Sequence, residues 1–508
     1  MEVEVGPEST RSWRGRGIHS THRGKAAMNG VPGLLWWGKE GGRIVFCEGM
    51  VAMRALRGVG LVLVGLLGLG SQGLAAQKLT VKARAARDAG WRREIKEALY
   101  VPETLPKLEA KVRSTFSPTE GVLADRVTYA TADGMVVPAI VYRPDPKVQH
   151  EKGKLAGRKL AGHKLPSRKL PGIVVVNGHG SDKFGWYAFY SGMMFAKAGA
   201  VVVTYDLIGE GERNTEKKSK AGSHDAWIGR NGLPGAAGNP VSEEWGRRLA
   251  GLMQVDLMQA VSYLDAQPEV DTKRVAVVGY SLGAFVSGIA GAIDPRIHAV
   301  VLSGGGVYDE VEPGYFEHNS LPCQGPPMRA LRPLGDRAAV LFALNADRGP
   351  MLVMNGDDDT VMDMAHHPPE WFASVRARAV ALRGTDKDVF TTIVYPGISH
   401  RTSWVNKDGV SWLSKQIHLP FWTEKDIATA PVTHVSTWAK ANDVDIAPNY
   451  ILENREGGLD AVGTGFPGIK REDLMVLPEE DWVRMKDKLT YEGWVAAVRA
   501  EMPNTDSH

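Results

Sequence analysis

Short runs of apolar residues alternate with longer stretches of helical character through the middle of this 508-residue chain. The runs are aliphatic and uncharged, and they occupy residues 173–176, 200–204, 275–278, 299–302 and 351–354. The helical stretches between them include residues 186–198, 243–264 and 284–293. Strands that are apolar on both faces and alternate with helices indicate a mostly parallel central sheet with helices on both faces. We therefore expect an α/β fold.

The segments on either side of this alternating region have other patterns. Residues 77–118 have helical character in places, and we expect an N-terminal helical segment there. Apolar runs flank Asp133-Gly134 within residues 127–142, which predicts a β-hairpin. After about residue 420 no strand pattern recurs, so the tryptophan-containing residues 421–508 predict a C-terminal helical extension packed on the core.

These boundaries place the main domain at residues 119–420, with two interruptions. Residues 303–348 are richer in Gly and Pro, and we expect them to form an excursion over the carboxyl edge of the sheet. Residues 152–170 contain a Lys-Leu pair every five residues. Since this period matches neither a helix nor a strand, we expect a basic, flexible surface insert. A polyanion-binding surface is the alternative for this insert.

The net charge of +3 conceals an uneven distribution of charge. Residues 152–169 contain seven Lys or Arg and no acidic residue, so the rest of the chain is acidic overall. Basic residues are nowhere interleaved with aromatic residues on one expected face, and we expect no nucleic-acid partner. The two cysteines, Cys47 and Cys323, exclude a disulfide-stapled scaffold and a cysteine-based zinc ribbon.

Residues 53–76 have the layout of a signal peptide that starts near Met53. Two arginines precede an apolar stretch at residues 58–70, and small residues suited to cleavage follow it. This stretch is shorter than the roughly 20 residues that span a bilayer, so we expect export to the periplasm or the exterior and no stable membrane span after cleavage. A membrane anchor is the alternative. Residues 1–52 then form a leader with two interpretations. Either the start site is placed too early and the leader is not part of the native protein, or the leader is a disordered tail.

The most informative short motif is Gly-Tyr-Ser-Leu-Gly at residues 279–283. Alone, this G-x-S-x-G pattern is common in long chains. Here it follows an apolar strand and precedes a helical stretch, which is the context of a nucleophile elbow. In such an elbow a strained turn presents the serine, here Ser281, at the start of a helix. Developing negative charge is stabilised at that position.

A serine hydroxyl needs a general base, and the base needs an orienting acid. In sheets of this kind the acid follows a later strand and the histidine comes last. Three aspartates, Asp357, Asp358 and Asp359, follow the apolar run that begins at residue 351. His400 follows another apolar run. The adjacent His366 and His367 point in different directions and do not predict a metal pair.

With these motifs in place, residues 120–420 resemble the α/β-hydrolase family. The resemblance implies that Asp359, the fourth residue of a G-x-x-D turn, is the acid of a Ser281–His400–Asp359 triad. Asp358 is the first alternative and Asp363 the second.

The resemblance also implies the donors of an oxyanion hole. One is the amide of Leu282, and the other comes from the loop around His179, through Gly180 or Ser181. His179 itself is expected to brace the loop, with a role as a second base as the alternative.

The stretch from Tyr205 to Arg213 is similar to the acetyl xylan esterase and dienelactone-hydrolase-like branch of that family. Asp206 is expected to be structural, whereas Glu210, Glu212 and Arg213 form a charged loop that could contact substrate. Acetyl xylan esterases often carry Gln after the serine, where this chain has Leu282. The Cys nucleophile of a dienelactone hydrolase is replaced by serine.

These observations predict a secreted serine hydrolase that cleaves carboxylic esters through an acyl-enzyme, with no metal or organic cofactor. The expected partner is an ester substrate, and acylated glycans are one candidate class. The alternatives are a peptidase of the prolyl-oligopeptidase type and a non-catalytic binding protein on a hydrolase scaffold.

Overall fold

The computed structural model describes residues 80–147, 169–219, 240–309, 321–446, 450, 458–463 and 465–501. The predicted leader, the predicted signal peptide and residues 152–168 of the basic insert lie outside these residues.

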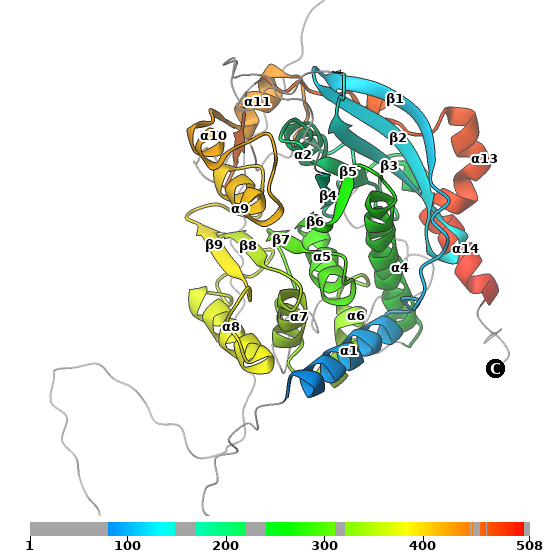
Figure 1. The fold of residues 1–508 in the computed structure, drawn as a ribbon. Coiled ribbons are helices and arrows are strands. Elements are labelled where there is room, and N and C mark those ends of the chain that lie inside the picture. The colour runs from blue at the N-terminus through cyan, green and yellow to red at the C-terminus, as the bar shows by residue number, and fades with distance from the viewer. Residues whose placement is uncertain are drawn as a thin grey trace, which may run out of the picture. The chain divides into compact units, whose positions relative to one another are not determined.

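A nine-stranded sheet organises the described part of the chain, with strand order β1-β2-β3-β5-β4-β6-β7-β8-β9 (Figure 1). The strands are β1 (Lys111–Thr119), β2 (Val122–Ala130), β3 (Val136–Pro144), β4 (Leu170–Val176), β5 (Val201–Tyr205), β6 (Val270–Tyr280), β7 (Ala299–Ser303), β8 (Met351–Gly356) and β9 (Thr391–Tyr395). The first three strands and the β3–β5 pair are antiparallel, and the strands from β5 to β9 are parallel. The predicted hairpin is confirmed as β2–β3, joined at residues 131–135.

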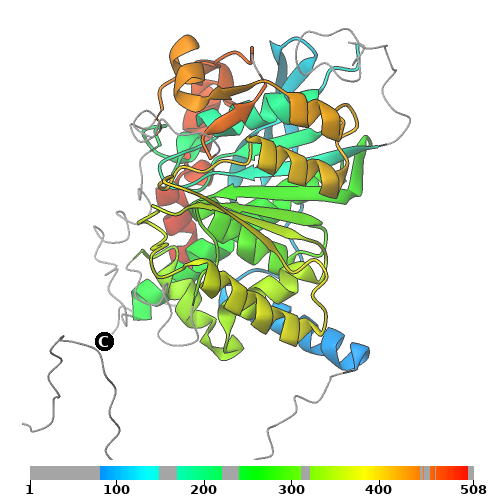
Figure 2. The ribbon, with the colours of Figure 1, turned by 90° about the vertical axis from the view of Figure 1, so that its left-hand side faces the viewer.

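Helices cover both faces of this sheet (Figures 1 and 2). On one face lie α1 (Val81–Ala98), α4 (Pro240–Asp265), α5 (Leu282–Ile293), α6 (Gly325–Ala330), α7 (Arg337–Ala346), α8 (Pro369–Arg383) and α14 (Tyr491–Glu501). On the other lie α2 (Trp186–Lys197), α9 (Lys407–Ile417), α10 (Glu424–Thr429), α11 (Val435–Ala441) and α13 (Glu479–Leu489).

The alternation of side chains within one strand explains why the central strands are apolar throughout. In β4, Val174 and Val176 belong to the apolar core on the α5 face, whereas Ile173 and Val175 belong to the core on the α2 face. Successive strand residues point to opposite faces, so a strand covered on both sides needs apolar residues at every position. The predicted α/β architecture is therefore confirmed.

Helix α1 confirms the predicted N-terminal helical segment, and strand β1 corrects its predicted extent of residues 77–118. Helix α1 ends at Ala98, and residues 111–119 form the outer strand of the sheet. Most side chains of β1 are exposed, because an edge strand with little cover needs no apolar pattern. The polar sequence of β1 therefore did not indicate a strand.

Two further expectations need correction. Part of residues 303–348 forms α6 and α7. Helix α7 packs against α5 and α8 on the face of the sheet, because the crossover between the parallel strands β7 and β8 runs over that face. The predicted C-terminal helical extension is confirmed, but the expected lack of strands there is wrong, because β10 (Val432–His434) and β11 (Asp460–Val462) form a small antiparallel pair among the helices.

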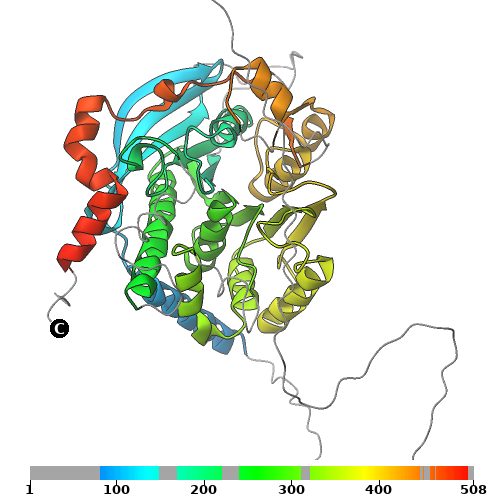
Figure 3. The same ribbon diagram turned by 180° about the vertical axis from the view of Figure 1, so that it is seen from behind.

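The C-terminal helices α13 and α14 lie against the outer strands, beside β1–β3 (Figure 3). Trp482 of α13 is buried in the core of the α2 face, and Trp494 of α14 is buried in the opposite core. These tryptophans are core residues, so the C-terminal region completes the same fold.

The order of the strands reverses at β4, because β5 lies on one side of it and β6 on the other. In open α/β sheets ligands bind outside the carboxyl ends of the strands at such a switch point. The residues that follow β4 and β6 are therefore the first place to look for chemistry.

Candidate active site

The turn between β6 and α5 holds Ser281 in a strained conformation. Its backbone angles are φ 54° and ψ −116°, a region that non-glycine residues rarely occupy. The two flanking glycines make the turn possible. A Cβ on Gly279 would lie 2.1 Å from the carbonyl oxygen of Gly283, and one on Gly283 would lie 2.2 Å from that of Val176. The sequence motif is thus a requirement of close backbone packing.

The structure brings Ser281, His400 and Asp359 together in one hydrogen-bonded chain. His400 Nδ1 lies 2.7 Å from Asp359 Oδ2, and His400 Nε2 lies 2.8 Å from Ser281 Oγ. Because an ionised carboxylate only accepts, Nδ1 of the neutral imidazole carries the proton and Nε2 accepts from the serine hydroxyl. This geometry can move a proton from the serine to the imidazole.

Burial and hydrogen bonding distinguish Asp359 from the neighbouring aspartates. Asp359 is 1% exposed, and its Oδ1 accepts from the amides of Val361 and Met362, both at 3.0 Å. Asp357 and Asp358 are exposed. Asp363 pairs with His366 instead, with its Oδ2 2.7 Å from His366 Nδ1. The amides orient Asp359 while its second oxygen remains available to His400.

Tyr280 supports the loop that carries His400. Its hydroxyl donates to the carbonyl of His400 at 2.6 Å and accepts from Arg401 at 2.6 Å. Burial raises the pKa of Tyr280 well above its ordinary value, so the phenol stays protonated and keeps this bond. Sequence reasoning did not identify this role, because nothing in the elbow motif specifies its second residue.

In the loop after β4, the amides of Gly180 and Ser181, which were the predicted oxyanion donors, have partners within the protein. The amide of Gly180 donates to Glu210 Oε1 at 3.2 Å, and the amide of Ser181 donates to the carbonyl of Gly178 at 3.2 Å. Both N–H groups therefore have acceptors within the protein. Leu282 is the first residue of α5, where an N–H lacks a partner within the helix.

Two glycines outside the predicted set pack against Ser281. A Cβ on Gly178 would lie 3.0 Å from that of Ser281, and a Cβ on Gly305 would lie 2.8 Å from its carbonyl oxygen. Gly305 belongs to a Gly-Gly-Gly sequence at residues 304–306, directly after β7. A Gly-Gly-Gly sequence at the carboxyl end of a buried strand is the signal from which this close packing against Ser281 could have been predicted.

His179 lies beside the site, and its ring contacts the buried thiol of Cys323, with Nε2 3.2 Å from Sγ. This contact fits the expected bracing role. His366 and His367 diverge, because His367 is buried and its Nδ1 lies 2.9 Å from the carbonyl oxygen of Met362. Within the residues that the structure describes, no cluster of metal-ligating side chains occurs.

The charged residues of the loop after β5 are buried, which corrects the expectation that Glu210, Glu212 and Arg213 form a loop open to substrate. Arg213 forms an ion pair with Asp256, and Asp206 pairs with Lys183, all of them fully buried. Asp206 therefore has the structural role expected of it.

Glu212 connects this buried charge cluster to the C-terminal region. Its carboxylate lies 2.8 Å from Lys183 Nζ and accepts from the amides of Val476 and Leu477, both at 2.9 Å. Burial alone would lower the pKa of Lys183, but the carboxylates of Asp206 and Glu212 outweigh burial and raise it. The ammonium therefore stays charged and holds the two carboxylates together.

The sequence model of the alpha/beta hydrolase family matches residues 173–454. The chain belongs to the alpha/beta hydrolase family. The matched range contains the elbow serine, the aspartate and the histidine of the hydrogen-bonded chain. The predicted family is thus confirmed, and the described fold agrees with it.

Solved structures of this fold resemble the chain at low sequence identity. Methylesterase BT1017 is 17% identical, with 83% of this chain and 77% of that chain covered and a TM-score of 0.49. Acetyl xylan esterase 1 from Thermoanaerobacterium sp. JW/SL YS485 is 20% identical, with 66% and 93% covered and a TM-score of 0.41. A glucuronoyl esterase from Solibacter usitatus is 16% identical, with 63% and 88% covered and a TM-score of 0.40.

Among curated proteins, a thiohydrolase of Arthrinium phaeospermum is 36% identical over 75 residues. The match spans 15% of this chain and about a fifth (21%) of that relative's length. None of the helices in the described ranges is long and apolar enough to cross a membrane.

Proposed function

We propose that this chain is an exported serine hydrolase that cleaves carboxylic esters through an acyl-enzyme intermediate. The observation that carries the proposal is the hydrogen-bonded chain from Ser281 through His400 to Asp359, with contacts of 2.8 and 2.7 Å, on a strained turn. A buried and oriented arrangement of this kind is costly to maintain and serves nucleophilic catalysis.

In the proposed reaction Ser281 Oγ attacks the ester carbonyl carbon while His400 Nε2 takes the hydroxyl proton. The tetrahedral intermediate carries its negative charge on the former carbonyl oxygen, near the amide of Leu282 at the start of α5. When the C–O bond to the leaving alcohol breaks, His400 returns the proton to that alcohol. The acyl group remains on Ser281.

Hydrolysis of the acyl-enzyme repeats these steps with water as the nucleophile. His400 accepts a proton from the water as it attacks the acyl carbon, and the serine recovers that proton when the carboxylic acid leaves. Asp359 holds Nδ1 protonated in the resting state and stabilises the imidazolium that forms in each step.

Two sequence patterns support the proposed substrate class and location. The signal-peptide pattern near Met53 indicates that the ester belongs to an external material. The similarity of residues 205–213 to acetyl xylan esterases favours acyl groups on carbohydrates. The named relatives include a thiohydrolase, so a thioester belongs among the test substrates.

Hydrolysis of short-chain aryl esters by the full chain and by Ser281→Ala tests the proposal. We expect the variant to lose activity by about 10⁴–10⁶-fold, because the nucleophile is removed. Ser374→Ala, at an exposed position on α8, serves as the matched control and should retain full activity. A panel of acetylated xylan, feruloyl, methyl uronate, thioester and prolyl peptide substrates then identifies the class. Activity that persists in Ser281→Ala contradicts the proposal.

A further inference from the structure

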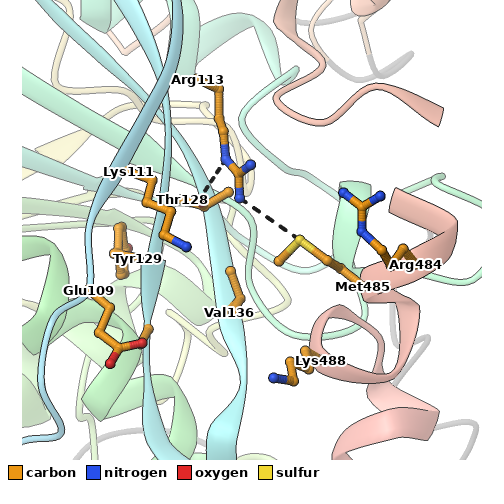
Figure 4. A pocket seen from close by; sticks show the side chains of 10 residues that line it. Glu109, Lys111, Arg113, Thr128, Tyr129, Val136, Arg484, Met485 and Lys488 are labelled. Atoms are coloured by element: carbon orange, nitrogen blue, oxygen red, sulfur yellow. Dashed lines mark hydrogen bonds between the residues drawn. The ribbon is translucent and has the colours of Figure 1, made fainter. Parts of the chain in front are cut away.

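A cavity lies between the outer strands and helix α13, among residues that the proposed reaction does not use. Its volume is about 300 Å³, and β1, β2, the start of β3 and α13 line it (Figure 4). The pairing of Ala139 with Tyr205 places the start of β3 near the carboxyl end of β5. Strand β2 is four strands from β6, so the cavity lies on the order of 20 Å from Ser281 across the sheet.

Four cationic side chains line this cavity: Lys111, Arg113, Arg484 and Lys488. One carboxylate, Glu109, is also part of the lining. The cavity is therefore strongly basic, although the chain is acidic overall outside its basic insert. Such a concentration of like charge is unfavourable unless counter-charges reduce the repulsion.

The two arginines share one counter-charge. Arg113 Nη1 lies 3.9 Å from Asp481 Oδ2, and Arg484 pairs with the same carboxylate. The side chain of Arg113 is also held in place, because its Nε donates to Thr128 Oγ1 at 3.1 Å. A guanidinium fixed in this way presents its remaining N–H groups in a defined direction.

The two lysines have no counter-charge of their own. Within the residues that the structure describes, neither Lys111 nor Lys488 forms an ion pair or a side-chain hydrogen bond. Figure 4 shows their ammonium groups turned toward the space between the strands and α13, from opposite sides. Two ammonium groups and the Arg113 guanidinium thus line this space, and Glu109 is the carboxylate in the same lining.

The lining of the cavity also has an apolar part. Val136 lies between the two lysines in Figure 4, and Tyr129 and Met485 complete this surface. A cavity with both parts fits a ligand that carries anionic oxygen groups on a compact carbon skeleton. We propose that this cavity is a binding site for a carboxylate- or phosphate-bearing ligand, separate from the candidate active site.

The anionic group has two possible sources, a free small molecule or an acidic unit of a glycan. Calorimetric titration of the full-length Ser281→Ala chain with inorganic phosphate, a galacturonate trimer and a neutral xylose trimer distinguishes them. Binding is measured without turnover, so the result does not depend on the proposed ester hydrolysis. We expect phosphate, the acidic trimer or both to bind, with an affinity that falls as salt is added, and the neutral trimer not to bind.

The variant Lys111→Gln/Lys488→Gln should bind the anion about tenfold more weakly, because two charge-assisted contacts at a partly exposed site are lost. Lys415→Gln/Lys425→Gln removes the same charge at exposed positions on α9 and α10 and should bind normally. If both pairs of substitutions weaken binding equally, general charge attraction explains it and the proposal is wrong. It is also wrong if neither anion binds or if the neutral trimer binds as well.

Discussion

The buried carboxylate of Glu212 is expected to hold the C-terminal region against the loop beside the candidate active site. Replacing it with Gln keeps the size of the side chain and removes its charge. The amide oxygen can accept from only one of the two amides, of Val476 or Leu477, and the NH₂ group then faces the other N–H. Lys183 loses one of its two carboxylate partners.

These lost contacts set the expected decrease in the free energy of unfolding. An orphaned buried N–H costs about 1–3 kcal/mol, and breaking a buried ion pair by removing one charge costs about 3–5 kcal/mol. Because Lys183 retains Asp206, we expect Glu212→Gln to lower the free energy of unfolding by about 3–5 kcal/mol in total. Domains are stable by only about 5–15 kcal/mol, so this loss is large.

A urea titration followed by tryptophan fluorescence measures the loss, since Trp482 Nε1 donates to the backbone carbonyl of Glu212 at 2.8 Å. Limited proteolysis should show earlier cleavage within residues 465–501 of the variant. Glu479→Gln is the control. That carboxylate pairs with Lys217 but is 74% exposed, so its loss should cost under about 1 kcal/mol. Equal stability of the two variants would refute this reasoning.

Three further predictions concern the candidate site and its surroundings. Gly283→Ala places a Cβ against the backbone, so it should lower the free energy of unfolding by about 1–3 kcal/mol and remove most of the esterase activity. Gly90→Ala, in open space within α1, should raise the free energy of unfolding by about 0.5–1 kcal/mol. Thermal unfolding and ester assays check both variants. Asp359→Asn should lower kcat by about 10²–10⁴-fold because the imidazole loses the partner that orients it, while the exposed Asp358→Asn should leave kcat within about twofold; equal kcat values would contradict the assignment. Burial, together with a neighbouring carboxylate, raises the pKa of Asp182 to about 6. The folded chain therefore binds the proton of this carboxyl group more tightly than the unfolded chain does. The stability that this proton binding provides is lost as the pH rises from about 4 to about 6. The corresponding slope of Tm against pH should be absent in Asp182→Asn, and an unchanged slope would exclude this carboxyl group as its source.

The sequence predicted those strands of the fold that are buried on both faces. The central strands are apolar throughout because helices cover both faces, and this alternation indicated the sheet. Strand β1 could not be predicted in this way, since an exposed edge strand with the sequence Lys-Val-Arg-Ser-Thr needs no such pattern. Strands β10 and β11 have three residues each, too few to show any periodicity.

The residues of the candidate site could likewise be predicted only in part. Ser281 and His400 were predicted because the elbow motif is local and the order of the triad residues follows from the sheet, whereas Asp359 was chosen among three aspartates through the family resemblance. The direction of the Gly180 amide was not predictable, because it depends on Glu210 from a different loop. The basic cavity was not predictable either, because residues near 111 and 488 meet only in the folded chain.

The central claim is that Ser281 is the nucleophile, activated by His400. Labelling the full chain with a fluorophosphonate, followed by mass spectrometry of the digested protein, tests it most directly. We expect a single adduct on the peptide that contains Ser281, and a loss of that adduct in His400→Ala. An adduct on another residue, or full esterase activity in a chain that does not react, would contradict the account.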